Sequence, residues 1–176
     1  MKATTTDQIR KPKQQSFSFI EPTKKDFGGS LLNGKRKAKR PLSFKKPMHF
    51  VLKSTKAKGS RCFVNHLRKV ESIIEQTSQK AHIKIYGKAI NFNHIHLVVQ
   101  LPDQENYKTW IRVLPAQIAE AVGATESLFD LRPHSTIVEW GRHFETVREY
   151  LVLNQMEIFG MRPAKSIGKR NLSAKP

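Results

Sequence analysis

The stretch of sequence that decides the fold reads Asn93-His94-Ile95-His96-Leu97-Val98-Val99. Apart from its polar residues it is a run of aliphatic side chains, many of them β-branched, which is typical of a β-strand. Side chains alternate between the two faces of a strand, so His94 and His96 share one face while Ile95, Leu97 and Val99 share the other. We expect the aliphatic face to enter a core. Two adjacent imidazoles suit a divalent cation, although two polar residues on a solvated face would give the same pattern.

A second informative segment lies more than fifty residues downstream, over residues 144–157. Its apolar residues Phe144, Val147 and Leu151 recur at helical spacing and form one stripe that continues to Ile158, directly after the segment. The pattern predicts an amphipathic helix. Tyr150 and Asn154 are four residues apart and therefore neighbours on one flank of that helix, beside the buried stripe. Taken alone, they could be an aromatic residue at the core boundary and a surface amide.

Together these two motifs resemble the single-tyrosine transposases of the His-hydrophobe-His nuclease superfamily, especially the REP-associated tyrosine transposases. The resemblance rests on the Asn-His-Ile-His strand and on the later Tyr-Leu-Val-Leu-Asn helix at residues 150–154. It covers most of residues 47–160, including the link at 129–144. Two positions depart from the family pattern. Gln155 and Phe92 stand where many relatives carry proline, and neither position supplies a ligand or a nucleophile.

The resemblance implies a metal-dependent cleavage of single-stranded DNA followed by strand transfer. Tyr150 would attack the scissile phosphate and form a 5′-phosphotyrosine link. Mg²⁺ or Mn²⁺ would be held by His94, His96 and, as the family implies, Asn154. The substrate would contain a hairpin. The family also implies a bacterial protein at the nucleoid, acting as a monomer or as a homodimer that exchanges the tyrosine helix.

The chain has only three tyrosines, and the sequence favours Tyr150 among them as the nucleophile. Tyr86 lies on an expected strand beside Lys84 and Lys88, where it could stack on a base. Tyr107 opens a helix without a ligand-type partner. Only Tyr150 has a carboxamide four residues further on.

The charge is strongly positive and unevenly distributed. The net charge is +18, and residues 1–47 hold 13 Lys or Arg against 3 acids. Residues 161–176 hold 5 against none, whereas the middle is nearly balanced with 14 against 11. We therefore expect a poorly ordered basic arm over 1–46, a nuclease-like domain over 47–160 and a basic tail over 161–176. Such arms attract a polyanion, although solvated tails or targeting segments would look the same. Candidate phosphate contacts within the domain are Lys88, Arg132 and Arg142.

The periodicities predict an α+β domain with a ferredoxin-like antiparallel sheet. Expected strands are 48–54, 82–90, 94–100 and 135–138, and the turn at 91–93 makes the two middle strands a hairpin. In the strand 82–90, Ile83, Ile85, Gly87 and Ala89 should share one face. Expected helices are 63–79, a second around 110–122 that Pro115 kinks or restarts, and the tyrosine helix. The first two helices should cover one sheet face and the histidines should lie on the other.

Composition excludes several classes of protein. No apolar run approaches the length of a membrane span, and the first residues lack a signal-peptide segment, so we expect a soluble cytoplasmic protein. The single cysteine, Cys62, excludes an intramolecular disulfide and a cysteine-rich zinc cluster. Two other functions stay open. One is a basic nucleic-acid-binding protein derived from a transposase that cleaves nothing, and the other is a metal-dependent hydrolase that uses an activated water.

Overall fold

The computed structural model describes residues 26–32, 39–129 and 131–161. Three short 3₁₀ segments precede the first long helix, at residues 29–32, 59–61 and 63–66. The strands and helices follow in chain order: β1 (Asp26–Phe27), β2 (Met48–Lys53), α1 (Leu67–Lys80), β3 (Lys84–Ile90), β4 (His94–Gln100), α2 (Gln104–Ala121), β5 (His134–Ile137) and α3 (Arg142–Ile158).

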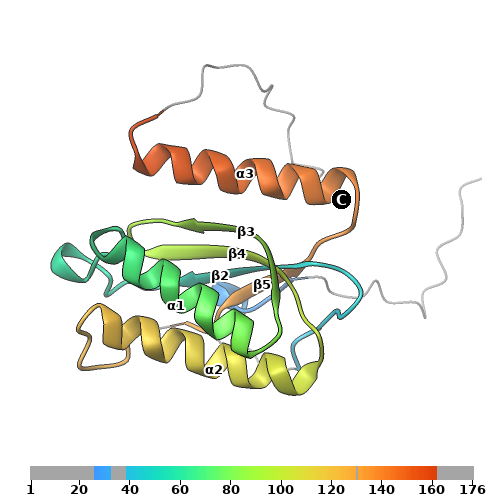
Figure 1. The fold of residues 1–176 in the computed structure, drawn as a ribbon, viewed down its shortest axis with the longest axis horizontal. Helices are drawn as coiled ribbons and strands as arrows, with labels where there is room; N and C mark the ends of the chain where they lie inside the picture. The colour runs from blue at the N-terminus through green and yellow to red at the C-terminus, as the bar shows by residue number, and fades with distance from the viewer. Residues whose placement is uncertain (1–25, 33–38, 130, 162–176) are drawn as a thin grey trace, which may run out of the picture.

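The five strands form one sheet in the order β1-β5-β2-β4-β3, and all neighbours are antiparallel. Strand β4 therefore lies between β2 and β3, and it forms the expected hairpin with β3. Figure 1 shows α1 and α2 against one face of the sheet and α3 on the opposite side. The expected fold class, an antiparallel sheet with two helices on one face and a separate tyrosine-bearing helix, is confirmed.

The main core lies between the sheet and the helices α1 and α2. Alternate residues of β2 and β4 supply its sheet side, and all six are completely buried: Met48, Phe50, Leu52, Ile95, Leu97 and Val99. Trp110 of α2 is buried among them and donates its indole N–H to Ser78 Oγ at 3.1 Å, so this buried polar group has a partner. The aliphatic face of the His-bearing strand thus enters the core as its alternation predicts.

Strand β3 differs from the prediction because it contains a bulge. The pairing with β4 shifts between Ile85 and Gly87, which leaves Tyr86 as the extra residue. A bulge reverses the faces of the residues that follow it. Ile85 consequently packs against the main core, whereas Ala89 belongs to a second cluster beneath α3. The expectation that Ile85, Gly87 and Ala89 share one face is wrong.

Several element boundaries also differ from those expected: α1 begins at Leu67 after a 3₁₀ turn over Phe63–His66, and α2 begins at Gln104. Strand β3 begins two residues late, because His82 adopts a left-handed conformation with φ of 52° directly after α1. The hydrogen bonds from His82 N to Gln79 O and from Ile83 N to Ser78 O close the helix end there. Helix α2 does not restart at Pro115 but continues through it, and Leu114 and Ile118, on either side, are fully buried.

Part of the N-terminal arm is docked on the sheet. Strand β1 pairs with β5, and Gly28 follows it with φ of 92° so close to Pro133 that a β-carbon would clash with the Pro133 carbonyl. Arg40 donates to Ser135 Oγ and, at 2.7 Å, to Pro133 O, and its guanidinium lies 4.6 Å from the Phe27 ring centroid. The expected lack of order up to residue 46 is therefore wrong for residues 26–32 and 39–46. Residues 1–25, 33–38 and 162–176 lie outside the described part.

We predict that Arg40→Ala destabilises the domain by about 2 kcal/mol, because it removes two hydrogen bonds of a charged, half-buried donor and leaves Ser135 without this partner. Urea unfolding followed by circular dichroism measures the change. The neighbouring Lys39 is exposed, so Lys39→Ala should change the stability by less than about 0.5 kcal/mol. Equal effects of the two substitutions would show that the arm contributes no specific stability.

Candidate active site

The two histidines of β4 lie on the face of the sheet that α3 covers. His94 and His96 alternate with the core residues of β4, and Val98 on their face packs into the second cluster with Phe144 and Leu151 of α3. The imidazole rings of the two histidines are 4.9 Å apart between centroids and nearly perpendicular. Strand geometry thus presents both imidazoles to the tyrosine helix.

Helix α3 is positioned by its buried residues and by a close approach to β3. A β-carbon at Gly87 would lie 3.1 Å from Leu151 Cδ2, so the missing side chain lets the helix settle on the strand. Gln155 fixes the other end, since its Oε1 accepts a hydrogen bond from Ile90 N at 3.0 Å. Gln155 therefore anchors the C-terminal half of α3 to the end of β3.

This packing brings Tyr150 against the histidines. The Tyr150 ring meets the His96 ring edge-on, with 5.5 Å between centroids, and the His49 ring at 6.5 Å. The phenol is 46% exposed, so a substrate can reach it. Segments separated by more than fifty residues in the sequence thus supply one cluster, as the two motifs together predict.

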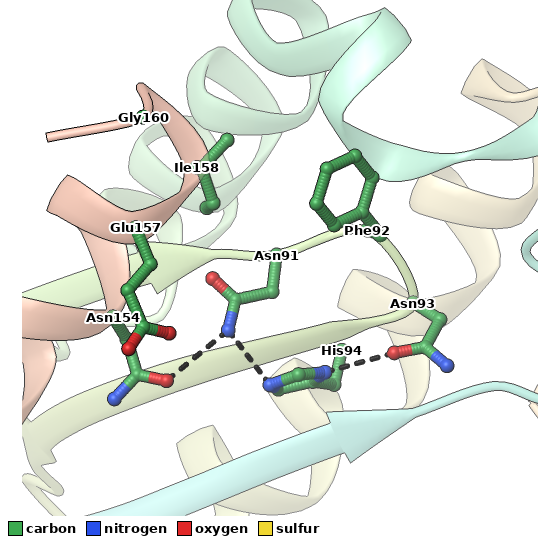
Figure 2. A pocket seen from close by; sticks show the side chains of 8 residues that line it. All are labelled: Asn91, Phe92, Asn93, His94, Asn154, Glu157, Ile158 and Gly160. Atoms are coloured by element: carbon green, nitrogen blue, oxygen red, sulfur yellow. Dashed lines mark hydrogen bonds between the residues drawn. The ribbon is translucent and has the colours of Figure 1, made fainter. Parts of the chain in front are cut away.

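Asn154 joins the same cluster one helical turn after Tyr150. Its Nδ2 donates to the backbone oxygen of Tyr150 at 2.7 Å, which turns its Oδ1 toward the strand. That oxygen accepts a hydrogen bond of 3.3 Å from Asn91 Nδ2, which also donates to His94 Nε2 at 2.7 Å, as Figure 2 shows. The side-chain oxygen of Asn154 and the Nε2 atom of His94 therefore face a common point.

The hydrogen bonds of His94 define which of its nitrogens carries the hydrogen. Its Nδ1 lies 2.9 Å from Asn93 Oδ1, an oxygen that can only accept. The hydrogen is therefore on Nδ1, and Nε2 keeps a lone pair directed at Asn91. Asn93, the first residue of the quoted motif, thus sets His94 in the tautomer that can bind a metal through Nε2.

His49 is a member of the cluster that sequence reasoning did not identify. Its ring stacks on His96 with centroids 5.2 Å apart, and its Nε2 lies 3.1 Å from His96 Nδ1. Alternation along β2 puts His49 on the face opposite to Met48 and Phe50. This alternation could have identified His49 from the sequence as a residue of the histidine face. The register that places it diagonally from His96 exists only in the folded sheet.

The histidines of the cluster are held neutral. Burial, assisted by the nearby His134 and His143, lowers the pKa of His49 to about 4. Burial, with His49 and His94 adding to it, lowers the pKa of His96 to about 3. Burial and the neighbouring Lys53 also lower the pKa of His94. Neutral imidazole is the form that binds metal ions, and His96 Nε2 is buried without a partner among the described residues.

The three candidate phosphate contacts do not gather at this cluster. Lys88 points to the other face of the sheet, where its ammonium pairs with Glu71 at 2.7 Å and with Glu75 at 2.5 Å. Arg132 is exposed before β5, at the far side of the sheet from β3, and Arg142 is exposed at the first residue of α3. Lys88 lies on the face opposite to Tyr86 because the bulge of β3 separates them.

A pocket of about 890 Å³ opens beside the cluster. Its lining comes from the β3–β4 turn and from the end of α3: Asn91, Phe92, Asn93, His94, Asn154, Glu157, Ile158 and Gly160. Phe92 is 60% exposed at its rim. Within residues 26–32, 39–129 and 131–161, no three His, Cys, Asp or Glu side chains gather as a metal site. The candidate donor set instead mixes imidazole nitrogens with amide oxygens.

No helix within residues 26–32, 39–129 and 131–161 is apolar over a length that would cross a bilayer.

Two transposases are among the solved structures that resemble this chain. A REP-associated tyrosine transposase bound to a REP hairpin matches with a TM-score of 0.59 and 12% identity, over 69% of this chain and 73% of that one. A candidate transposase of Deinococcus radiodurans R1 matches with a TM-score of 0.43 and 13% identity, over 68% and 98%. No protein-family model and no curated protein matches the sequence. The first similarity confirms the expected fold.

We predict that the metal-free protein loses stability as the pH falls from about 6.5 toward 4. The pKa values of His49 and His96 are lower in the folded protein than the usual 6.5 of the unfolded chain. The unfolded chain therefore binds more protons in this range, and the contribution is complete above pH 6.5 and lost below it.

Urea unfolding at several pH values in the presence of a chelator measures this loss. In His49→Gln, which keeps a hydrogen-bonding side chain but cannot titrate, the loss between pH 7 and pH 5 should be smaller by about 2 kcal/mol. An unchanged pH profile in this variant would contradict the assignment to the stacked histidines.

Proposed function

We propose that this protein is a single-tyrosine transposase-type nuclease that cleaves and rejoins single-stranded DNA through a 5′-phosphotyrosine link. The observation that carries the proposal is the contact of Tyr150 with His96, together with the bridge that Asn91 forms between Asn154 and His94 on the same face of the sheet. The transposase-like fold supports it. All of these side chains come from one chain, so a monomer can form the site without exchanging α3.

The residues of the site fit a hard divalent cation such as Mg²⁺ or Mn²⁺. The lone pair of His94 Nε2, the unpartnered Nε2 of His96 and the Oδ1 of Asn154 are the atoms that would hold it. A bound cation would polarise a non-bridging oxygen of the scissile phosphate. This matters because a phenol has an ordinary pKa near 10 and is a weak nucleophile at neutral pH.

In the proposed reaction, the Tyr150 oxygen forms a bond to phosphorus and the bond from phosphorus to the 3′ oxygen breaks. The phenolic proton is given up and the leaving oxygen ends as a 3′ hydroxyl, so the step neither consumes nor releases water. The new link keeps the energy of a phosphodiester. A second 3′ hydroxyl can therefore attack it and join two strands without ATP.

The proposed substrate is single-stranded DNA that contains a hairpin. The REP-associated transposase that shares the fold is bound to a REP hairpin, and this chain carries a net charge of +18. A polyanion is the partner that such a charge attracts most strongly. Arg132 and Arg142 remain candidate phosphate contacts because both are exposed. Lys88 is a weaker candidate, since two carboxylates already engage its ammonium.

We predict that the protein forms a denaturation-resistant adduct with a labelled single-stranded hairpin oligonucleotide in Mn²⁺, and that Tyr150→Phe abolishes it. Only the phenolic oxygen of Tyr150 can supply the covalent bond in this mechanism. Gel electrophoresis in detergent measures the adduct. The matched control is Tyr86→Phe, which also removes one hydroxyl but from a ring packed against Trp140 and Phe144, and it should keep the adduct.

The same experiment separates the two other functions. A metal-dependent hydrolase would cut the DNA without an adduct, would tolerate Tyr150→Phe and would lose activity in His94→Ala. A binding protein without catalytic activity would bind the DNA but leave it uncut, both as the wild type and in every variant. Either result would overturn the proposed mechanism.

We also predict that Asn154→Ala reduces the rate of adduct formation at least about 100-fold, because it removes a proposed ligand oxygen. The loss should be relieved in part by raising the Mn²⁺ concentration, and a chelator should abolish the wild-type reaction. Gln76→Ala, which removes an exposed amide from α1, serves as the control and should react as the wild type. A rate that is unaffected in Asn154→Ala would exclude this residue from the site.

A further inference from the structure

Asn91 holds a position that the proposed metal site does not yet explain. It is the first residue of the β3–β4 turn, the residue is only 7% exposed, and its backbone N–H donates to His94 O at 2.8 Å. Its Nδ2 donates to His94 Nε2 and to Asn154 Oδ1, as Figure 2 shows. Its Oδ1 is buried and has no hydrogen-bond partner among the described residues.

The amide nitrogen of Asn91 occupies the point toward which two of the proposed ligand atoms direct their lone pairs. A lone pair that accepts a hydrogen bond cannot bind a cation at the same time. His94 Nε2 has a single lone pair, so any cation that it holds must displace this nitrogen. The amide has two ways to yield: it can rotate about its last side-chain bond, which exchanges nitrogen and oxygen, or it can leave the site.

The surroundings of Asn91 favour rotation. The hairpin hydrogen bond fixes its backbone, and its side chain is more than nine-tenths buried, so there is little room to swing out. Rotation directs Oδ1, which now lacks a partner, at the same point. An amide oxygen is a suitable ligand for Mg²⁺ or Mn²⁺. Glu157 lines the same pocket and adds a negative charge to its lining (Figure 2).

We propose that Asn91 is a further protein ligand of the cation and that its side-chain amide turns over when the cation binds. Without a cation, its NH₂ group bridges His94 and Asn154 and keeps both ligands oriented. With a cation, its Oδ1 joins His94 Nε2, His96 Nε2 and Asn154 Oδ1. This inference rests on the proposed function, because it concerns the same site.

The test measures Mn²⁺ affinity directly, by isothermal titration calorimetry on the full chain without DNA. Asn91→Ala should weaken Mn²⁺ binding at least about ten-fold, whereas Asn91→Asp should bind at least as tightly as the wild type because it offers a charged oxygen. Gln76→Ala should bind as the wild type. Unchanged or tighter binding by Asn91→Ala would overturn the proposal, since it would mean that the amide only blocks the site.

A second measurement uses the wild-type protein and so does not depend on how the variants fold. The side-chain NH₂ resonances of Asn91, assigned through their bonds to the backbone in spectra of the isotope-labelled wild-type protein, should shift on titration with Mg²⁺ and saturate with the rest of the site. Resonances that stay in place at saturation would also overturn the proposal. The adduct assay is independent of both readouts. A protein that forms the Tyr150 adduct but shows no effect of Asn91 refutes this inference alone.

Discussion

Strand β4 is covered on both faces, and the alternation of its side chains is the constraint on which the rest of the structure depends. Its odd-numbered aliphatic residues close the core against α1 and α2, and they are completely buried. A slip of one residue would move two imidazoles into that core and three aliphatic side chains out of it. The burial of Ile95, Leu97 and Val99 therefore fixes the direction in which His94 and His96 point.

The second face of β4 is closed by a much smaller set of contacts. Five buried residues form this cluster, and only Phe144 and Leu151 come from α3. The absence of a side chain at Gly87 and the hydrogen bond from Ile90 N to Gln155 complete the seat of the helix. A cluster this small leaves one flank of α3 open beside the histidines, and that flank carries Tyr150. Neighbouring stripes of one helix thus carry the buried contacts and the exposed phenol.

Buried polar atoms without partners are rare in folded proteins, and two of them belong to residues of the proposed site. His96 Nε2 and Asn91 Oδ1 are both unpartnered among the described residues, next to a tightly hydrogen-bonded amide network. The lowered pKa values of His49 and His96 show that the same region keeps its imidazoles neutral. Such an arrangement reduces the stability of the fold and leaves unprotonated atoms that can bind a cation. Perturbed pKa values of this kind are common at functional sites.

The sequence by itself determined the alternation of β4, the amphipathic stripe of α3 and the neighbourhood of Tyr150 and Asn154, because all three follow from the local period of a strand or a helix. The tertiary structure alone decided which strands pair and in what register, since register depends on contacts between distant segments. It brought His49 beside His96 and Asn91 between His94 and Asn154, and its bulge at Tyr86 turned Lys88 away from the site. It also docked β1 and Arg40 on β5, where burial of a few side chains outweighs the basic composition of the arm.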